Sequence, residues 1–304
     1  MTKRNLSEKT KINIELYLLF LLPTLIYFVI FRYLPMVGVQ IAFKNYIPIK
    51  GFWNSPWAGL KHFRRFFNSY QFFIILKNTL GLSLYQLILG FPFPIILALM
   101  LHQVGNSKFK KFTQTVTYAP HFISVVVLVG MLHVFLNPRT GLINLLLTGI
   151  GSEPVFFMGK ASLFKTIYVL SSVWQNTGWG MIIYLAALSG ISPSLYEAAL
   201  IDGANRFQKI RYIDIPGILE TIIVLLILNT GRVMSLGFEK AYLMQNPLTL
   251  ESSEVISTYV YKVGLINAQF SFASAVGLFN GVINLILLVS VNKISKKVSS
   301  IGLF

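Results

Sequence analysis

EAALIDG at residues 197–203, followed nine residues later by IDIP at residues 213–216, is the part of the chain that decides its fold. It lies in a polar segment between two strongly apolar ones. A polar, charged insert of that kind belongs at a membrane face, because charged side chains and unpaired backbone groups are costly in hydrocarbon. Its small residues, its acids and its turn glycine favour a short helical hairpin that docks into a partner.

The local sequence predicts the course of this hairpin. Ser192 is expected to cap a first helix over residues 193–201, which begins with a proline. Gly203 permits the positive φ of a tight turn. A second helix over about 205–212 then leads to Pro216 at the start of the next apolar span. On these grounds alone, an ordinary amphipathic loop helix explains the segment equally well.

The composition is that of a membrane protein. Of 304 residues, 55% are hydrophobic and only 12% are charged, and the mean hydropathy is +0.67, whereas soluble domains are about 25% charged. The net charge of +16 would suggest nucleic acid in a soluble protein. Here the basic residues cluster between apolar runs, so membrane lipid and topology explain them and no nucleic acid is expected. The chain has no cysteine, which excludes disulfides and thiolate metal sites.

Six segments approach the roughly 20 apolar residues that a helix needs to cross a bilayer. They are 14–36, 75–101, 117–137, 164–190, 215–237 and 270–292. The sequence thus predicts an all-α integral membrane protein with one six-helix domain over residues 14–292. The positive-inside rule places residues 1–13, the loop 191–216 and the tail 293–304 in the cytoplasm, because short basic segments gather there. Both termini are therefore expected to be cytoplasmic in a multi-pass protein of a bacterial cell membrane.

The hairpin resembles the EAA motif of ABC-importer permeases. That motif reads Glu-Ala-Ala, three residues, Gly, nine residues, Ile, one residue, Leu-Pro, and this chain departs from it only in having Ile215 for the Leu. In that family the loop forms a coupling helix that sits in a cleft of a cytoplasmic ATPase. The resemblance implies the type I importer permease fold, which is MetI-like, with a cytoplasmic coupling helix.

The coupling role falls by position to four residues of the motif, and neighbouring charges add three candidates. The motif residues are Glu197, Ala198, Ala199 and Gly203. The alanines let another backbone approach closely, and the carboxylates of Glu197 and Asp202 suit a basic groove. Arg206 and Lys209 would face acidic partner residues or phosphate headgroups.

The resemblance covers most of the chain. YAPHFIS (118–124), GW (178–179), IYLAAL (183–188) and DGA (202–204) look like carbohydrate-uptake permeases related to the maltose importer. GFE (237–239), NP (246–247) and VISTYVY (255–261) are similar to the LplB-type branch, which serves polysaccharides and complex oligosaccharides. The resemblance thus implies the permease subunit of an ATP-driven importer that takes up complex oligosaccharides or polysaccharide fragments.

The chain lacks the motifs of an enzyme. No G-x-x-x-x-G-K-[S/T] occurs, and no cytoplasmic segment is large enough for a nucleotide-binding domain. The four histidines are scattered without a carboxylate cluster, so neither a metal site nor a catalytic residue is expected. ATP and magnesium would be bound by a partner. The resemblance implies two copies of a cytoplasmic ABC ATPase, a second homologous permease in a heterodimer, and an extracellular solute-binding protein.

Polar residues within the spans are candidates for the substrate path, because they should face the bundle interior or an aqueous cavity. Sugars are bound by aromatic stacking and side-chain hydrogen bonds. The candidates are Tyr85, Gln86, Trp174, Gln175, Asn176, Trp179, Asn229, Arg232, Asn280 and Asn284. Asparagines can instead tie helices together, and tryptophans can anchor a helix at the interface. Arg232 would suit an acidic oligosaccharide such as a uronate, or it pairs with Glu220 or Glu239 or extends outward.

Two other functions fit parts of the pattern. One is an ABC importer permease for a non-sugar solute. The other is an ion-coupled secondary transporter, which would need carboxylates within the membrane. The acids near spans, Glu15, Glu220 and Glu239, lie close to the span ends.

Overall fold

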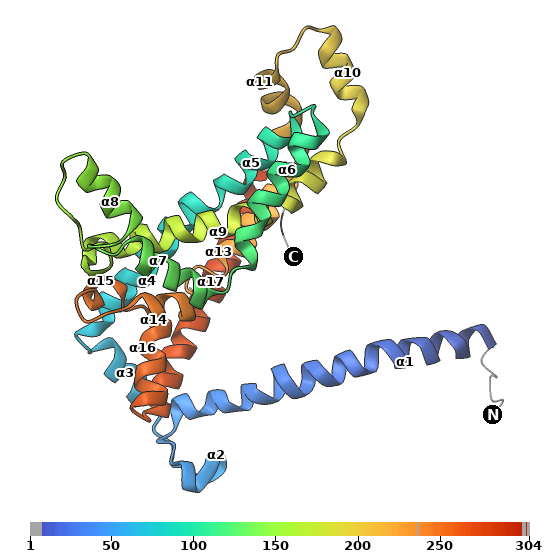
Figure 1. Cartoon of the computed structure of the whole chain (residues 1–304). Helices are drawn as coiled ribbons and strands as arrows, with labels where there is room; N and C mark the ends of the chain where they lie inside the picture. The colour runs from blue at the N-terminus through green and yellow to red at the C-terminus, as the bar shows by residue number, and fades with distance from the viewer. Residues whose placement is uncertain (1–7, 236, 300–301, 303–304) are drawn as a thin grey trace.

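The computed structural model describes residues 8–235, 237–299 and 302. Within these ranges the chain is helical, and its only strand-like feature is an isolated bridge between Lys44 and Trp57. Residues 1–7 of the predicted segment 1–13 lie outside the described residues. Of the predicted tail 293–304, residues 300, 301, 303 and 304 lie outside them as well. The all-α prediction agrees with this architecture (Figure 1).

The centre of the molecule is a bundle of five helices. They are α4 (Gln71–Gly90), α5 (Pro92–His102), α9 (Ala161–Ser189), α13 (Leu219–Thr230) and α17 (Phe270–Ser299). Helix α9 packs against both α4 and α5, and α13 packs against α17. The break between α4 and α5 falls at Phe91, because Pro92 has no backbone N–H to continue the helical ladder.

Helix α1 (Glu8–Phe28) stands apart from this bundle (Figure 1). It continues through a π turn, Val29–Tyr33, into a 3-10 segment, Leu34–Phe43, which packs against α17. The helical course therefore continues past residue 36, the predicted end of the first span. Pro35 lies at the start of the 3-10 segment, where a missing N–H is harmless, so the helix goes on to Phe43. None of the most apolar stretch of Glu15–Phe43 is buried.

The described residues contain three helices that are both long and apolar enough to span a membrane, Glu15–Phe43, Gln71–His102 and Phe270–Lys297. Three further pairs of helices qualify if each bent pair is one span, which gives up to six. The third predicted span, 117–137, is not continuous. Helix α6 (Ser107–Tyr118) and a 3-10 turn, Ala119–Phe122, meet α7 (Val125–Phe135) at 98°.

The bend in the third span has a local cause. Pro120 cannot donate to the helical ladder, and Ile123 adopts an extended conformation. Ser124 then starts a new helix, because its hydroxyl accepts a hydrogen bond from the Val127 N–H at 3.3 Å. The serine in the quoted YAPHFIS segment is thus a helix cap.

The fifth predicted span, 215–237, is also displaced. The helical chain runs from Arg206 through Pro216 to Gly217, and then bends by 62° at Ile218 into α13. Helix α13 ends at Thr230, where Gly231 follows. The sixth span is longer than its predicted 270–292, because α17 continues to Ser299 and carries the tail lysines with it.

Short helices gather at the end of the molecule opposite α10 and α11 (Figure 1). They are α2 (Gly51–Asn54), α3 (Lys61–Phe67), α8 (Leu142–Gly149), α14 (Phe238–Met244), α15 (Leu250–Ser253) and α16 (Ile256–Tyr261). The segments 37–74, 138–163 and 238–269, which lie between predicted spans, are thus largely folded into helical turns.

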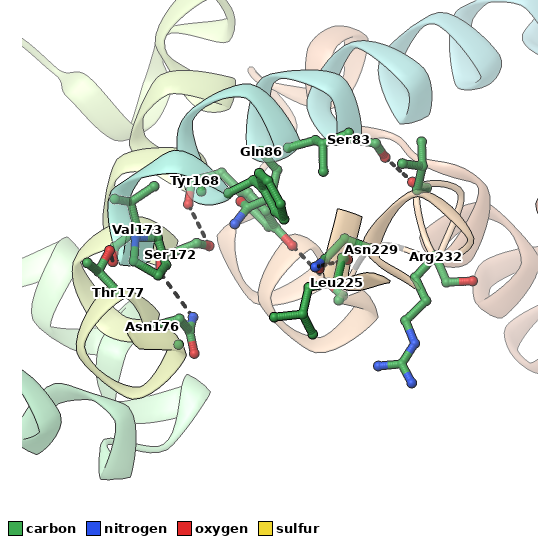
Figure 2. A pocket seen from close by; sticks show the side chains of 18 of the residues that line it. Ser83, Gln86, Tyr168, Ser172, Val173, Asn176, Thr177, Leu225, Asn229 and Arg232 are labelled. Carbon is green, nitrogen blue, oxygen red and sulfur yellow. Dashed lines mark hydrogen bonds between the residues drawn. The ribbon is translucent and has the colours of Figure 1, made fainter. Parts of the chain in front are cut away.

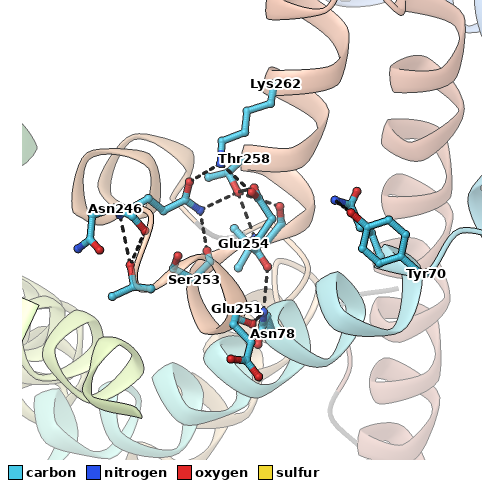
Figure 3. Close-up of polar contacts among 12 residues, drawn as sticks. Tyr70, Asn78, Asn246, Glu251, Ser253, Glu254, Thr258 and Lys262 are labelled. Carbon is cyan, nitrogen blue, oxygen red and sulfur yellow. Dashed lines mark hydrogen bonds and ion pairs between the residues drawn. The ribbon is translucent and has the colours of Figure 1, made fainter. Parts of the chain in front are cut away.

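A polar network fixes part of this end (Figure 3). Lys262 forms an ion pair with Glu254 at 2.6 Å and donates to Gln245 at 2.9 Å. The Thr258 hydroxyl donates to the same Glu254 carboxylate at 2.6 Å. Asn78 of α4 donates to the carbonyl of Glu254 at 3.2 Å, so the segment after α14 is tied to the bundle. The Lys262 pair is the one salt bridge found among the described residues.

Candidate functional site

A cavity of about 450 Å³ opens between α4, α5, α9 and α13 (Figure 2). Its polar lining includes Ser83, Gln86, Asn176, Asn229 and Arg232. Of the three aromatic residues in its lining, Phe91 is partly exposed and adds apolar surface, whereas Tyr168 and Tyr184 are buried in the wall. Such a mixture of rings and hydrogen-bonding groups suits a sugar, whose faces are apolar and whose rim is polar.

The cavity lies between two apolar clusters that fix its walls. Val173 belongs to a cluster with Leu82 and Met244, and Tyr184 belongs to another with Met181 and Ile218. Both Val173 and Tyr184 also line the cavity. The helices therefore pack closely in these two clusters and stay apart around the cavity.

Close backbone contact also holds the wall. A Cβ atom at Gly178 of α9 would overlap the carbonyl group of Thr117 in α6. At Gly180 a Cβ would lie 3.1 Å from the ring of Pro94. The glycines thus let α9 approach two neighbours closely, which accounts for the GW pair at 178–179 as a packing feature.

Arg232 is the single charged residue that lines this cavity. No ion pair or hydrogen bond of its guanidinium is found among the described residues, so the predicted pairing with Glu220 or Glu239 is absent there. Figure 2 shows its side chain extended away from the ribbon, clear of the other labelled residues. The lining contains no carboxylate, so the cavity carries an uncompensated positive charge.

Lys240 stands behind the same wall. It is 5% exposed, and its Nζ donates to the Ser172 hydroxyl at 2.6 Å and to the Tyr168 carbonyl at 3.0 Å. The ammonium also lies 4.8 Å from the centre of the Tyr168 ring. All of these partners are neutral, and burial lowers the pKa of Lys240 to about 7.

Four of the predicted path residues line the cavity, namely Gln86, Asn176, Asn229 and Arg232. The Nδ2 groups of Asn176 and Asn229 donate to carbonyls of their own helices, at Ser172 and Leu225, which leaves their oxygens available. The oxygen of Asn176 receives one further contact, from a ring nitrogen of His121 at 3.2 Å.

The other six predicted residues lie elsewhere. Tyr85 packs on an apolar cluster, and Trp174 is half exposed on the outside of α9. Gln175 is buried and donates to the Ile123 carbonyl at 2.8 Å, where it supports the bend before α7. Trp179 stacks on His121, with ring centres 4.6 Å apart.

Asn280 and Asn284 belong to α17 and do not line the cavity. The Asn284 oxygen accepts from the Met234 N–H at 3.0 Å, and its Nδ2 donates to the Ser235 hydroxyl at 2.8 Å. Asn284 is therefore a helix tie, the alternative considered above. The buried oxygen of Asn280 has no hydrogen-bond partner among the described residues.

The sequence did not single out several cavity residues. They are Ser83, Tyr168, Ser172, Thr177 and Tyr184. Hydroxyl groups such as those of Ser172 and Thr177 bond back to carbonyls one helical turn earlier, so they are compatible with any span. Four of the five cavity residues lie on α9 and Ser83 lies on α4, so no single sequence pattern would have marked them all.

The hairpin projects from the far end of the bundle (Figure 1). Helix α10 (Pro193–Ile201) has the predicted bounds, and Gly203 has a φ of 71°. Helix α11 (Arg206–Lys209) starts with a capping box in which Asn205 and Gln208 exchange hydrogen bonds of 2.9 and 2.7 Å.

Two predictions for the hairpin need correction. The Ser192 hydroxyl caps no backbone N–H; it contacts the Ser194 hydroxyl at 2.8 Å instead. The second helix does not stop near residue 212, because α11 passes into a π turn, Ile210–Asp214, and on to Gly217.

The candidate coupling residues lie on an accessible surface. Glu197, Ala198, Asp202, Gly203 and Arg206 are exposed, and Ala199 and Lys209 are partly buried. Large apolar side chains accompany them, namely Leu195, Leu200, Ile201 and Phe207. Ile201 is 87% exposed at the tip. A tip that is both apolar and charged is typical of a surface that a partner protein covers.

Comparison with known proteins identifies the family. The family described as the binding-protein-dependent transport system inner membrane component matches residues 90–300. Protein LplB of Bacillus subtilis (strain 168) is 46% identical over 289 residues, which are 95% of this chain and 91% of that protein. The polygalacturonan/rhamnogalacturonan transport system permease protein YteP of the same organism is 45% identical, over 95% of this chain and 90% of that protein.

Solved structures give the same result. A crystal structure of a bacterial ABC transporter involved in import of the acidic polysaccharide alginate contains a chain with a TM-score of 0.88 and 42% identity, over 96% of this chain and 98% of that one. A second structure of a bacterial alginate ABC transporter, in complex with a periplasmic protein bound to alginate pentasaccharide, gives 0.89 and 42%, over 98% and 99%. The family expected from the sequence is confirmed, and the chain belongs to the inner membrane components of binding-protein-dependent transport systems.

Proposed function

We propose that this chain is a permease subunit of an ATP-driven importer for acidic oligosaccharides, in which the cavity beside Arg232 forms part of the sugar path. The observation that carries the proposal is the unpaired guanidinium in a cavity without a carboxylate. Two similar proteins are named for acidic cargo, polygalacturonan in one case and alginate in the other. A uronate carboxylate would supply the missing negative charge.

The cavity residues would divide the work of recognition. Arg232 would hold a carboxylate by charge-assisted hydrogen bonds. Gln86, Asn176 and Asn229 would bond to hydroxyl groups, and the partly exposed ring of Phe91 would pack against a sugar face. Of the other predicted residues, Trp179 stays a candidate at a different point of the path, since its ring is 45% exposed.

The hairpin would couple transport to ATP hydrolysis. Its exposed apolar tip and the charges of Glu197, Asp202 and Arg206 would fill a cleft of a cytoplasmic ATPase. Two copies of that ATPase would bind ATP and magnesium, and this chain would bind neither. Closure of the ATPase would then bias the bundle between two states that face opposite sides of the membrane.

The remaining partners follow from surfaces left open in this chain. An apolar helix whose most apolar stretch is not buried in this chain suits a second, homologous permease that would cover part of it. With each bent pair counted as one span, six spans would place both termini on the same side of the membrane, which the positive-inside rule makes the cytoplasm. The short helices opposite the hairpin would then face an extracellular solute-binding protein.

The test is a matched pair of substrates on the reconstituted importer. Uptake of a uronate oligosaccharide and of its carboxyl-reduced, neutral form is measured with the wild type, Arg232→Gln and Arg232→Lys. Because the guanidinium is solvent-exposed, we expect Arg232→Gln to lower uptake of the acidic sugar about fivefold, on the order of 1 kcal/mol. Uptake of the neutral sugar should hardly change, and Arg232→Lys should be intermediate.

Asn284→Ala is a suitable control, because Asn284 lies outside the cavity. It should affect both sugars alike. An equal loss for the two sugars in Arg232→Gln would contradict the role of the charge, and absence of oligosaccharide uptake in the wild type would contradict the proposed cargo.

A further inference from the structure

Asp214 is a completely buried carboxylate at the root of the hairpin. Its exposed fraction is 0%. One oxygen accepts from the Gln103 side-chain amide at 2.6 Å, and the other accepts from the Tyr196 hydroxyl at 2.7 Å. No salt bridge to it is found among the described residues. A buried carboxylate is tolerated only when hydrogen bonds replace its lost hydration, so both donors matter to it.

The three residues come from three different parts of the fold. Gln103 directly follows α5, Tyr196 lies on α10, and Asp214 closes the π turn that leads towards α13. In sequence, Gln103 is 111 positions from Asp214. This cluster, called the hairpin joint below, thus links the hairpin to two helices that line the cavity.

Tyr196 is the critical member of the hairpin joint. Among the described residues, it is the only side chain of α10 with a hydrogen bond to another helix or its flank. Its hydroxyl also lies 3.2 Å from a ring nitrogen of His102, the last residue of α5. Burial and the bond to Asp214 raise the pKa of Tyr196, so its hydroxyl keeps the proton that it donates.

Tyr196 directly precedes Glu197, the first residue of the exposed motif. One face of α10 is therefore open to a partner, while Tyr196 ties the helix to the bundle. The ring of Tyr196 packs beside His102, with ring centres 5.7 Å apart. Ile191, five residues before Tyr196, and Ile218, four residues after Asp214, pack in one apolar cluster.

We propose that Asp214, Tyr196 and Gln103 are positioning residues that transmit the movement of the docked hairpin to α5 and α13. The proposal rests on the proposed function, because it requires that an ATPase moves the hairpin. It assigns the transmission to three side chains behind the motif. The bend of 62° after Gly217 lies four residues beyond Asp214, so α13 can change its angle close to the point where the joint holds the chain.

The test uses the complete importer in proteoliposomes, with the second permease, the ATPase and the binding protein present. ATP hydrolysis and sugar uptake are measured in the same vesicles for Tyr196→Phe, Asp214→Asn and Asp214→Leu. Tyr196→Phe removes one donor and keeps the ring. We expect this variant to assemble and hydrolyse ATP, while the amount of sugar transported per ATP falls about fivefold or more.

Asp214→Asn should retain much of the coupling, because its amide oxygen still accepts from Tyr196 and a rotated Gln103 can accept from its amide. Leucine can neither accept a hydrogen bond from Tyr196 nor bond to Gln103, so Asp214→Leu should lose the coupling. Tyr242→Phe is the matched control, since Tyr242 lies on α14, at the end of the molecule opposite the hairpin (Figure 1), and should keep the wild-type ratio.

Each outcome has a distinct meaning. An unchanged ratio of sugar to ATP in an assembled Tyr196→Phe complex overturns the proposal, and so does a loss of both activities in equal proportion. If Tyr196→Phe fails to assemble, the comparison of Asp214→Asn with Asp214→Leu decides. A wild-type complex without sugar-stimulated ATP hydrolysis would contradict the proposed function itself and is thereby distinguished from failure of the joint.

Discussion

Lys240 is a lysine held away from water by neutral groups alone. Its ammonium has a hydroxyl, a carbonyl and an aromatic ring around it, and no carboxylate. Nothing in the sequence marked this residue, because a lysine in a segment between two spans is usually exposed to water. Its burial depends on the fold of α14 over the end of α9, which no local pattern reveals.

Stability should depend on pH through Lys240. Burial lowers its pKa from 10.5 to about 7, so between these values the unfolded chain binds more protons than the folded chain. Stability contributed at this site therefore rises as the pH increases from 7 towards 10. We expect the unfolding temperature in detergent to rise by a few °C between pH 7 and 9, on the order of 1–2 kcal/mol.

Lys240→Met should remove this part of the pH dependence, whereas Lys108→Met, at an exposed position of α6, should keep it. Thermal unfolding of the two variants and the wild type in parallel checks the point. Identical pH slopes for Lys240→Met and the wild type would show that the lysine does not titrate in this range.

The predicted path residues show what residue type and spacing can predict about a site and what they cannot. Gln175 and Asn176 are adjacent amides in the same span, yet one supports a bend and the other lines the cavity. Polarity within a span predicted that each would face protein. Which helix each one faces depends on the rotation of α9 in the bundle, and that is set by contacts with several helices at once.

At the scale of elements, the hairpin is the best predicted part of the chain. Helix α10 begins at its proline and ends before a glycine with positive φ, as local chemistry requires. The bends at Ile218 and beside Ser124 were missed, because apolar content continues across both of them. A hydropathy pattern indicates the length of an apolar segment, but it does not show where the helix changes direction.

The turn at Gly203 gives a prediction for the hairpin. A Cβ at this position would meet no atom within 4 Å, so any cost of substitution comes from the φ of 71°. We expect Gly203→Val to strain the turn by about 1–2 kcal/mol and to displace α11 from its partner. Sugar-stimulated ATP hydrolysis should fall several-fold while the subunit still inserts in the membrane.

Gly203→Asn provides the control, because asparagine tolerates the left-handed region and should stay near the wild-type rate. ATP hydrolysis by reconstituted complexes is the measurement. Equal rates for the valine and asparagine variants would mean that the turn conformation does not matter for coupling.

For the whole molecule, the separation of α1 is the main departure from a self-contained bundle. The sequence correctly predicted an apolar helix there, but its pattern could not show whether the helix packs on its own chain. Apolar residues that face lipid and apolar residues that face another subunit look alike in a sequence. The part of this N-terminal helical segment that packs extensively on the bundle is the 3-10 segment, Leu34–Phe43, which contacts α17.

We expect α1 to contact the second permease in the assembled importer. A photoreactive amino acid at Leu22, on the exposed α1, should give a covalent adduct with the mass of two permeases after irradiation. The same label at Leu82, which is buried in the bundle, should give none. Mass spectrometry of the adducts is decisive, and labelling of lipid alone at Leu22 would contradict the expected contact.

The network of Lys262, Glu254 and Thr258 has a consequence for the direction of opening. Through Asn78 of α4 it is tied to one end of the bundle, whereas the opposite end has the exposed hairpin and a bend at Ile218. A helix bundle that is rigid at one end and bent at the other end opens mainly at the bent end. Most of the displacement should then occur near the hairpin. The opposite end should keep its shape while a solute-binding protein docks on it.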